Sequence, residues 1–219
     1  MKHKQLRCVI FGPQGCGKGT QGSLLADRFN VHLIGAGDLF RAEMAEKSKL
    51  GHLVKQYVDQ GLLAPDELVN AIMARQLKKM DLERGFILDG YPRNVEQATY
   101  LERLLPVNLA LQIKIGDDEV VRRLAGRWQC TKCKSVYHET QAPPAEKGIC
   151  SMCGHTLVRR DDDVPDVIRQ RLKGYHFMTA PLANFYRQRG VLLAVNGEQQ
   201  ISYLFDDIVK KLGKLGFAP

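Results

Sequence analysis

LRCVIFGPQGCGKGT, at residues 6–20, is the most informative stretch of this sequence. It begins as a short β-prone apolar run, and apolar residues then recur with helical spacing over residues 18–29. Between the two lies a loop rich in glycine that contains Lys18. Glycines let consecutive backbone N–H groups converge on a phosphate, and the N-terminus of a following helix adds its positive dipole end. The stretch therefore predicts a strand, a phosphate-binding loop and a helix in succession.

One position departs from the usual phosphate-loop pattern. The lysine of that pattern is followed directly by Ser or Thr, whereas Lys18 is followed by Gly19 and the hydroxyl comes from Thr20. We expect Lys18 to reach the terminal phosphates, and magnesium to be held mostly through phosphates and water. The alternative is a glycine-rich strand-to-helix turn with an accidental lysine. Cys16, inside the loop, is expected to be open to alkylation or oxidation.

The rest of the chain repeats the alternation of strand and helix. Further β-prone runs occur at residues 32–34, 86–88, 109–115 and 191–195, and helix-like segments follow them. This order predicts a parallel sheet covered by helices on both faces. Two segments interrupt it: residues 38–79 read as helix only, and residues 126–163 contain many glycines and prolines together with clustered cysteines. We interpret the second interruption as a small inserted subdomain.

Composition excludes several classes of protein. The chain has 219 residues, 44% of them hydrophobic and 26% charged, which is ordinary for a globular protein that buries its own core. Apolar stretches such as residues 191–195 are too short to cross a bilayer, and no signal-type apolar region follows the basic N-terminus. The net charge of +8 favours an anionic partner such as a nucleotide, a nucleic acid or an acidic membrane surface.

The clustered cysteines have the spacing of a metal site. Cys130 and Cys133 form one C-x-x-C pair, and Cys150 and Cys153 form a second after a sixteen-residue spacer. Two such pairs, brought together by a hairpin, supply four thiolates for a closed, structural zinc site. The alternatives are two disulfides, another metal, or a histidine in place of one cysteine. Because the chain lacks export signals, we expect metal binding in reducing cytosol.

A second group of candidate site residues combines one acidic residue with several basic ones. Asp89 ends a predicted strand at the sheet edge where α/β proteins bind ligands, and from there a carboxylate can hold water on magnesium. A turn-forming Asp-Gly pair is the plainer interpretation. No Ser-His-Asp arrangement is evident, whereas arginines around a phosphate loop suit phosphoryl transfer, in which catalysis is mostly positioning and charge neutralisation. The arginines in question are Arg41, Arg93, Arg123, Arg127, Arg160 and Arg171.

Taken in order, these segments resemble adenylate kinase in its bacterial long-lid form. The resemblance covers essentially the whole chain and adds, to the loop, the segments at 37–41, 89–93, 126–127, 160–163 and 169–172. It implies a P-loop nucleoside monophosphate kinase-like α/β fold, with a five-stranded parallel core sheet flanked by helices, a helical AMP-binding insertion and a small zinc-stapled β-rich lid. The implied domains are a core of residues 1–34, 65–125 and 164–219, an AMP-binding insertion of residues 35–64 and a lid of residues 126–163.

The resemblance also implies a function. The reaction is MgATP + AMP ⇌ 2 ADP, on a monomeric cytoplasmic enzyme with Mg²⁺ as cofactor and structural Zn²⁺, whose partners are these nucleotides rather than nucleic acid or membrane. The catalytic residues implied are Lys18, Asp89, Arg93, Arg127, Arg160 and Arg171. Those implied for ATP are Gly15, Cys16, Gly17, Lys18, Gly19, Thr20, Arg123, Arg127, Val136, Tyr137 and Gln199. Those implied for AMP are Ala36, Arg41, Leu62, Leu63, Ala64, Gly90, Tyr91, Pro92, Arg93, Gln97, Arg160 and Arg171.

Two departures from the family pattern matter. Ala36 stands where the family usually has a threonine that contacts the AMP base, which weakens the preference for AMP. Cys153 completes an all-cysteine set, which strengthens the zinc prediction. Two rival functions remain at this point: a kinase for GMP, UMP or CMP, and a zinc-ribbon protein that binds nucleic acid. The second lacks the interleaved aromatic residues that nucleic-acid binding favours, since only Trp128 and Tyr137 lie near the cysteines.

Overall fold

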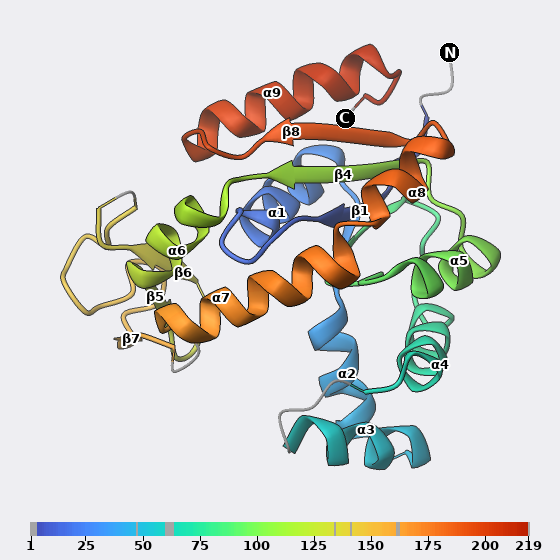
Figure 1. The fold of residues 1–219 in the computed structure, drawn as a ribbon, viewed down its shortest axis with the longest axis horizontal. Coiled ribbons are helices and arrows are strands. Elements are labelled where there is room, and N and C mark those ends of the chain that lie inside the picture. Colours follow the sequence, from blue (N-terminus) through green and yellow to red (C-terminus); the bar gives the residue numbers. More distant parts are fainter. Residues whose placement is uncertain are drawn as a thin grey trace.

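The core of the protein is a five-stranded parallel sheet (Figure 1). The computed structural model describes residues 4–46, 48–59, 64–133, 135–140, 142–160 and 163–218. In spatial order, the strands are β2 (His32–Gly35), β3 (Phe86–Asp89), β1 (Arg7–Phe11), β4 (Leu109–Lys114) and β8 (Leu192–Asn196). The predicted parallel sheet is confirmed, and each strand lies within two residues of its predicted position.

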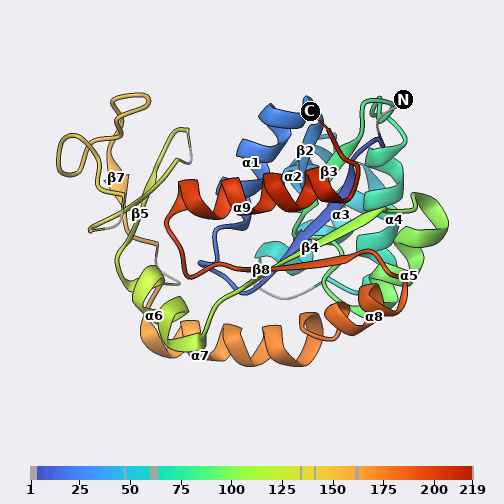
Figure 2. The same cartoon turned by 90° about the horizontal axis from the view of Figure 1, so that it is seen from above.

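Helices cover both faces of this sheet (Figure 2). Side chains alternate along β1, so that Cys8 and Ile10 join one apolar cluster while Val9 and Phe11 join the other. The first cluster is covered by α1 (Lys18–Phe29) and α9 (Ile201–Lys214). The second is covered by α4 (Asp66–Leu77), α5 (Val95–Leu104) and α8 (Leu182–Gln188). Because both faces are buried, the strands are apolar almost throughout rather than alternating with polar residues.

A helical insertion separates β2 from β3. It begins with α2 (Ala36–Ala45) and α3 (Lys49–Asp59), which extend below the sheet and lead into α4 (Figure 1). Glu43 is buried among these helices and bonds to Ser48 and Gln76. A side chain at position 51 would overlap the Glu43 carbonyl oxygen, since an added Cβ would lie 2.3 Å from it. Gly51 therefore permits the close packing of α2 and α3, and the helical prediction for this region is confirmed.

The second interruption is a separate small antiparallel sheet. Its strands are β5 (Arg127–Cys130), β6 (Val136–His138) and β7 (Leu157–Val158), in the order β6-β5-β7. They lie at the opposite end of the molecule from α4 and α5 (Figure 1). The sheet has its own small apolar cluster, in which Trp128 and Tyr137 pack against Cys130, Cys150 and Leu157. This confirms the prediction of a small β-rich lid.

Two helices connect the lid to the rest of the molecule. The first is α6 (Asp117–Ala125), which precedes β5, and the second is α7 (Pro165–Gly174), which continues as a π-helical turn at Tyr175–Thr179. Val120 and Leu124 of α6 pack against Ile168 and Leu172 of α7. Within the described ranges, no helix is long and apolar enough to cross a bilayer.

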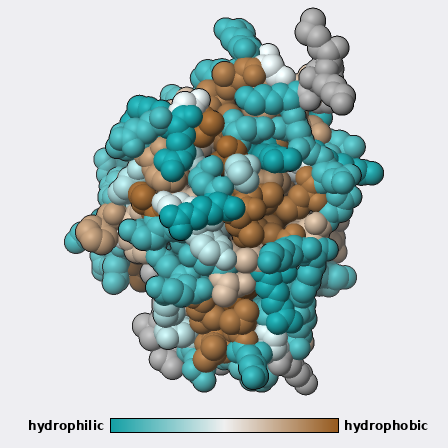
Figure 3. Space-filling model, turned by 90° about the vertical axis from the view of Figure 1, so that its right-hand side faces the viewer, coloured by the Kyte–Doolittle hydropathy of each residue, from teal (hydrophilic) through white to brown (hydrophobic). Residues whose placement is uncertain are grey.

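The face that carries α4 and α5 shows a group of hydrophobic residues at its centre, bordered by hydrophilic ones (Figure 3). This side lies away from the lid (Figure 1).

Candidate active site

The glycine-rich loop connects β1 to α1 at the carboxyl edge of the sheet. Gly12 approaches β4 so closely that an added Cβ would lie 2.4 Å from the Ile113 carbonyl oxygen. Gly15 has a φ of +75°, which L side chains rarely adopt, and an added Cβ would lie 3.1 Å from the Leu124 side chain. The loop is thus pressed against β4 and α6, and its shape depends on glycine at both positions.

Lys18 folds back over this loop. Its Nζ donates to the carbonyl oxygens of Gly12 and Pro13, at 2.9 and 2.8 Å. Gly17, Gly19 and Thr20 flank it at the start of α1, and Gly19 and Thr20 are exposed. The ammonium group therefore lies at the mouth of the loop, where a bound phosphate could take the place of the two carbonyl oxygens.

The expectation that Cys16 is open to modification is wrong. Its side chain is buried and packs in the apolar cluster below α1, next to Ile10 and Ile113. Burial also raises the pKa of the thiol, although the nearby Lys18 ammonium opposes this. The thiol is consequently both shielded and protonated at neutral pH. The sequence did not reveal this, because glycines on both sides of a residue usually indicate exposure.

Asp89 ends β3 beside the loop, and cations surround it. An added Cβ on Gly19 would lie 3.8 Å from Asp89 Oδ2, so the carboxylate faces the start of α1. Desolvation raises the pKa of Asp89, while Lys18 and Arg93 lower it. Desolvation likewise lowers the pKa of Arg93, with Asp89 raising it and Arg171 lowering it further. Four charged groups predicted from distant parts of the sequence thus lie close enough to influence one another.

The backbone of Arg93 is anchored by its neighbours. Its N–H donates to Gln97 Oε1 at 2.8 Å, and its Nε donates to the Gly90 carbonyl at 2.9 Å. Gln97 is buried, and its Nε2 donates to Asp66 Oδ1 at 2.6 Å. Both polar ends of the Gln97 side chain are therefore engaged within the protein.

The other residues expected to contact AMP lie at the ends of β2 and β3. Ala36 is buried and faces Gly90, since an added Cβ on Gly90 would lie 3.7 Å from the Ala36 methyl group. Tyr91 and Pro92 are buried, and the Tyr91 hydroxyl donates to Asn70 Oδ1 at 2.6 Å. Ala64 is partly buried against the core. Leu62 and Leu63, the expected wall of the base site, lie outside the described residues.

Arg41 pairs with an acidic residue of its own helix. It lies on α2, its side chain is largely exposed, and it pairs with Asp38 one helical turn earlier. Its guanidinium lies near the start of that helix, because an added Cβ on Gly37 would lie 3.3 Å from Arg41 Nη1.

Arg123 joins the loop to the end of β8. It lies on α6 beside Gly15, its Nε donates to Glu119 Oε1 at 2.6 Å, and its Nη2 donates to the Gly197 carbonyl at 2.8 Å. Arg122, with Arg123 beside it, lowers the pKa of Glu119 to about 2, so this carboxylate stays charged. Gln199 follows two residues later, and its Nε2 donates to the Asn196 carbonyl at 2.7 Å. Arg123 and the segment 196–199 thus share one corner with the phosphate loop.

Arg127 and Asp163 close the base of the lid. The Arg127 guanidinium donates from Nε and Nη2 to the two carboxylate oxygens of Asp163, at 2.7 and 2.6 Å. The side chains are 16% and 4% exposed, so solvent screens this pair weakly. Arg127 is the first residue of β5, and Asp163 lies shortly before α7. The bond therefore joins the segment that enters the lid to the segment that leaves it. Arg160 is exposed just before Asp163.

The cysteine cluster has the geometry of a metal site. All four Sγ atoms lie within 4.8 Å of one another. The closest pairs, Cys130 with Cys153 and Cys133 with Cys150, are 3.4 and 3.5 Å apart, which is too far for a disulfide. Four sulfurs about 2.3 Å from one zinc ion have separations of this order. The donor set therefore fits zinc, and the disulfide alternative is wrong.

Two residues expected near the ATP base also belong to the lid. Val136 and Tyr137 lie in β6, where Val136 is exposed and the Tyr137 hydroxyl lies 3.3 Å from Cys150 Sγ. The lid sheet lies to one side of the five-stranded sheet (Figures 1 and 2). The structure therefore brings the loop, Asp89, Arg93, Arg123 and Arg171 together, whereas the β6 residues lie in the separate sheet of the lid.

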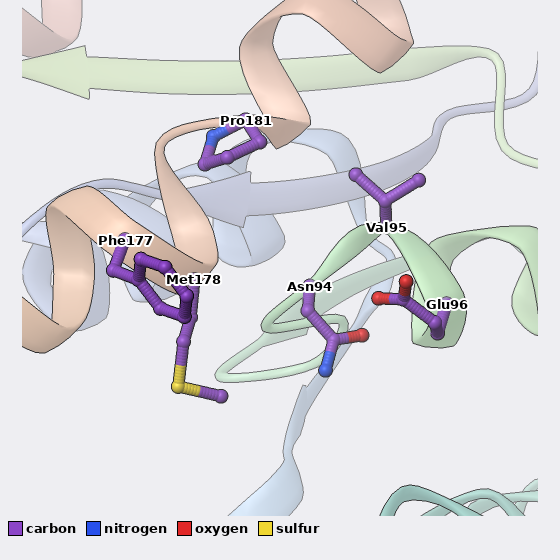
Figure 4. Close-up of a pocket in the computed structure, with 6 residues that line it drawn as sticks. All are labelled: Asn94, Val95, Glu96, Phe177, Met178 and Pro181. Carbon is purple, nitrogen blue, oxygen red and sulfur yellow. The ribbon is translucent and has the colours of Figure 1, made fainter.

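A cavity of about 370 Å³ lies beside Arg93, between the N-terminus of α5 and the π-helical turn (Figure 4). It is lined by Asn94, Val95, Glu96, Phe177, Met178 and Pro181. Sequence reasoning missed this region and the Gly197 carbonyl, and although it included Asp163 in the segment 160–163, it gave that residue no role. For Asp163, the signal available was its place directly before the helix that opens at Pro165. For a backbone carbonyl, the sequence offers no signal.

Comparison with known proteins gives one consistent family. The family model described as Adenylate kinase matches residues 10–191 of the chain. The adenylate kinase of Thermoanaerobacter sp. strain X514 is 38% identical over 216 residues, which cover 96% of this chain and 100% of that protein. The adenylate kinase of Methanosarcina mazei is 39% identical over 214 residues, covering 95% of this chain and 99% of that protein. The adenylate kinase of Clostridium acetobutylicum is 40% identical over 215 residues, covering 96% and 100%.

Proposed function

The chain belongs to the adenylate kinase family, so that it is an ATP:AMP phosphotransferase, and from this premise we propose how its residues divide the reaction MgATP + AMP ⇌ 2 ADP between them. The observation that carries the proposal is the convergence of Lys18, Asp89, Arg93 and Arg171 at the carboxyl ends of β1 and β3. Phosphoryl transfer needs positioned cations more than a base, because the acceptor phosphate is already an anion.

On the ATP side, the loop amides from Gly15 to Thr20 and the Lys18 ammonium hold the phosphates. Arg123 is anchored beside the loop by Glu119 and Gly197, and Arg127 reaches the phosphates from the lid base. Val136, Tyr137 and Gln199 surround the adenine by packing and backbone contacts. When bound with ATP, Mg²⁺ would neutralise phosphate charge. Asp89, a carboxylate set back at the end of β3, would hold the water around the ion.

On the AMP side, Arg41, Arg93, Arg160 and Arg171 gather the phosphate and the transferring group. Ala36, Leu62, Leu63, Ala64, Gly90, Tyr91, Pro92 and Gln97 form the base site. Because the side chains of Tyr91 and Gln97 are engaged inside the protein, the backbone at residues 90–92 supplies most of that contact. Ala36 offers no hydroxyl, so the selection for adenine rests on fewer hydrogen bonds.

Residues 35–64 and 126–163 move as two units over a core of residues 1–34, 65–125 and 164–219. Closure is required because the lid residues lie in a separate sheet, to one side of the core sheet (Figure 1). It expels water, which strengthens the arginine contacts and prevents loss of the phosphoryl group to hydrolysis.

Cys130, Cys133, Cys150 and Cys153 hold one structural zinc ion, which keeps the lid rigid and takes no part in the chemistry. The enzyme acts as a monomer in reducing cytosol, where its six cysteines stay out of disulfides.

One assay tests the proposal. Purified protein is given MgATP with AMP, GMP, UMP or CMP, and ADP formation is measured, with zinc content determined on the same sample. We expect the highest rate with AMP and one zinc ion per chain. A higher rate with UMP or CMP would move the assignment to another monophosphate kinase, and oligonucleotide binding without turnover would support the nucleic-acid rival.

A further inference from the structure

A hydroxyl group from another helix holds the backbone of Arg93. Thr179 Oγ1 donates to the Arg93 carbonyl oxygen at 2.8 Å. Thr179 ends the π-helical turn Tyr175–Thr179, which is 86 residues away from Arg93 along the chain. The bond therefore joins the long α7 segment to the loop that follows β3.

This bond completes a set of anchors around one residue. Gln97 fixes the N–H of Arg93, Gly90 fixes its Nε, and Thr179 fixes its carbonyl. Gln97 is itself held by Asp66 and by the cap of α5, because its own N–H donates to Asn94 Oδ1 at 2.8 Å. Hydrogen bonds thus hold the peptide units on both sides of Arg93 and the Nε of its guanidinium.

The sequence and shape of α7 explain why Thr179 faces Arg93. Arg171, Tyr175 and Thr179 recur at intervals of four and so lie along one side of a helix. Arg171 influences Arg93 electrostatically, and Tyr175 lies near Gln112 and Cys16 of the core. The Ala180 N–H donates to the Tyr175 carbonyl at 2.9 Å, a π-type bond that adds one residue to the turn. Pro181 directly follows, and it cannot donate to the carbonyl four residues before it.

Part of the contact between the two elements is open, although α8 packs against α5 just beyond Thr179. The cavity of about 370 Å³ lies along this seam, between Asn94–Glu96 on α5 and Phe177, Met178 and Pro181 on the other side (Figure 4). Phe177 is 83% exposed and does not fill it. The Thr179 hydroxyl supplies a directional contact beside this opening, where side chains leave a gap.

We propose that Thr179 is a positioning residue for Arg93, and that its hydroxyl aims the guanidinium at the transferring phosphoryl group without touching substrate. The inference rests on the proposed role of Arg93. It predicts that loss of the hydroxyl lowers turnover more than it lowers nucleotide binding. A misplaced guanidinium stabilises the transition state less well, because charge develops there.

The test compares Thr179→Val, which keeps the shape and removes the donor, with Thr179→Ser, which keeps the donor. Thr99→Val is the matched control, because Thr99 Oγ1 also donates to a backbone carbonyl at 2.8 Å, that of Val95 on α5. We expect Thr179→Val to lower kcat about tenfold and to change the KM values for ATP and AMP much less. Thr179→Ser and Thr99→Val should stay close to the parent protein. Equal loss in the Val and Ser variants would overturn the proposal.

A double variant separates positioning from general destabilisation. If Thr179 acts through Arg93, then adding Thr179→Val to Arg93→Ala costs no further activity; a further tenfold loss contradicts the inference. If Arg93→Ala lowers kcat and Thr179→Val does not, the inference fails and the proposed function stands. If Arg93→Ala leaves kcat unchanged, the role assigned to Arg93 is wrong as well. Thermal unfolding of each variant is measured alongside, and Thr179→Ala replaces Thr179→Val if the latter does not fold.

Discussion

At the residue scale, the carboxyl group of Asp89 is held where its charged form is disfavoured. Desolvation raises the pKa of Asp89 above its ordinary value, and Lys18 and Arg93 only partly oppose this. A carboxyl whose pKa is higher in the folded state stabilises the fold at low pH, and this contribution is lost as the pH rises through the folded-state pKa. The protein therefore sacrifices stability at neutral pH for a charge in its active site.

Removing that charge should stabilise the fold. We expect Asp89→Asn to unfold at a higher temperature than the parent protein at pH 7, and to lose activity with MgATP. The stability difference should grow from about pH 4 upwards and level off once Asp89 is fully ionised in the parent protein. Calorimetry across this pH range measures it. A difference that is negative, or that does not depend on pH, would show that the surrounding cations outweigh desolvation.

Lys18 offers a second test at this scale. Its ammonium bonds to two loop carbonyls, and on ATP binding we expect it to move to the phosphates. Lys18→Met keeps the aliphatic stem and should lower turnover by about a hundredfold or more, while the thermal unfolding temperature changes little. Lys114→Met, at an exposed position at the end of β4, is the matched control. Turnover within a few fold of the parent enzyme would exclude Lys18 from the mechanism.

At the element scale, the Arg127–Asp163 bond determines how the lid is joined to the core. Asp163→Asn would leave the guanidinium without its buried counter-charge, a loss of about 3 kcal/mol, which for a chain of this length lowers Tm by about 6–12 °C. Asp166→Asn is the control, because Asp166 pairs with Arg169 in an exposed position, where its side chain is 97% exposed, and such pairs contribute little. If the two variants unfold at the same temperature, the lid-base pair has no special structural role.

The lid depends on its metal because its apolar cluster is small. Zinc ligation can contribute on the order of 10 kcal/mol to a domain of this kind. We expect Cys130→Ser to lose the zinc and to lower Tm, while turnover at low temperature falls less. Cys8→Ser is the comparison, since Cys8 is buried in β1: it should destabilise the protein and leave the zinc content unchanged. A zinc-loaded, equally stable Cys130→Ser variant that is inactive would contradict a purely structural metal.

At the scale of the whole molecule, the lid and the α2–α3 insertion extend from different sides of the sheet (Figure 1). We expect both units to close over one pair of nucleotides. We expect a bisubstrate analogue, two adenosines joined by a polyphosphate, to lower the radius of gyration measured by small-angle X-ray scattering. Inorganic phosphate should leave it unchanged. Binding of the analogue, seen by calorimetry, without compaction would show that the site forms without closure.

Hydrophobic period, glycine spacing and cysteine spacing already indicated the parallel sheet, the phosphate loop and the metal site, because each of these signals is local. The same local reasoning failed at Cys16, whose burial depends on the packing of β4 and α6 against the loop. It also missed Thr179, since a threonine before a proline carries no sign that its hydroxyl meets a carbonyl 86 residues away.

The order of residues along the chain already determined which helices and strands form, and which chemistry the phosphate loop can support. The tertiary structure decided which charged groups lie close together. It placed Asp89 near Lys18 and Arg93. It also paired Arg127 with Asp163, while Arg41 pairs with Asp38. The physical reason is the distance along the chain over which each kind of interaction acts. Backbone preferences act over a few residues, whereas the energy of a charge depends on burial and on neighbours that only the folded chain brings near.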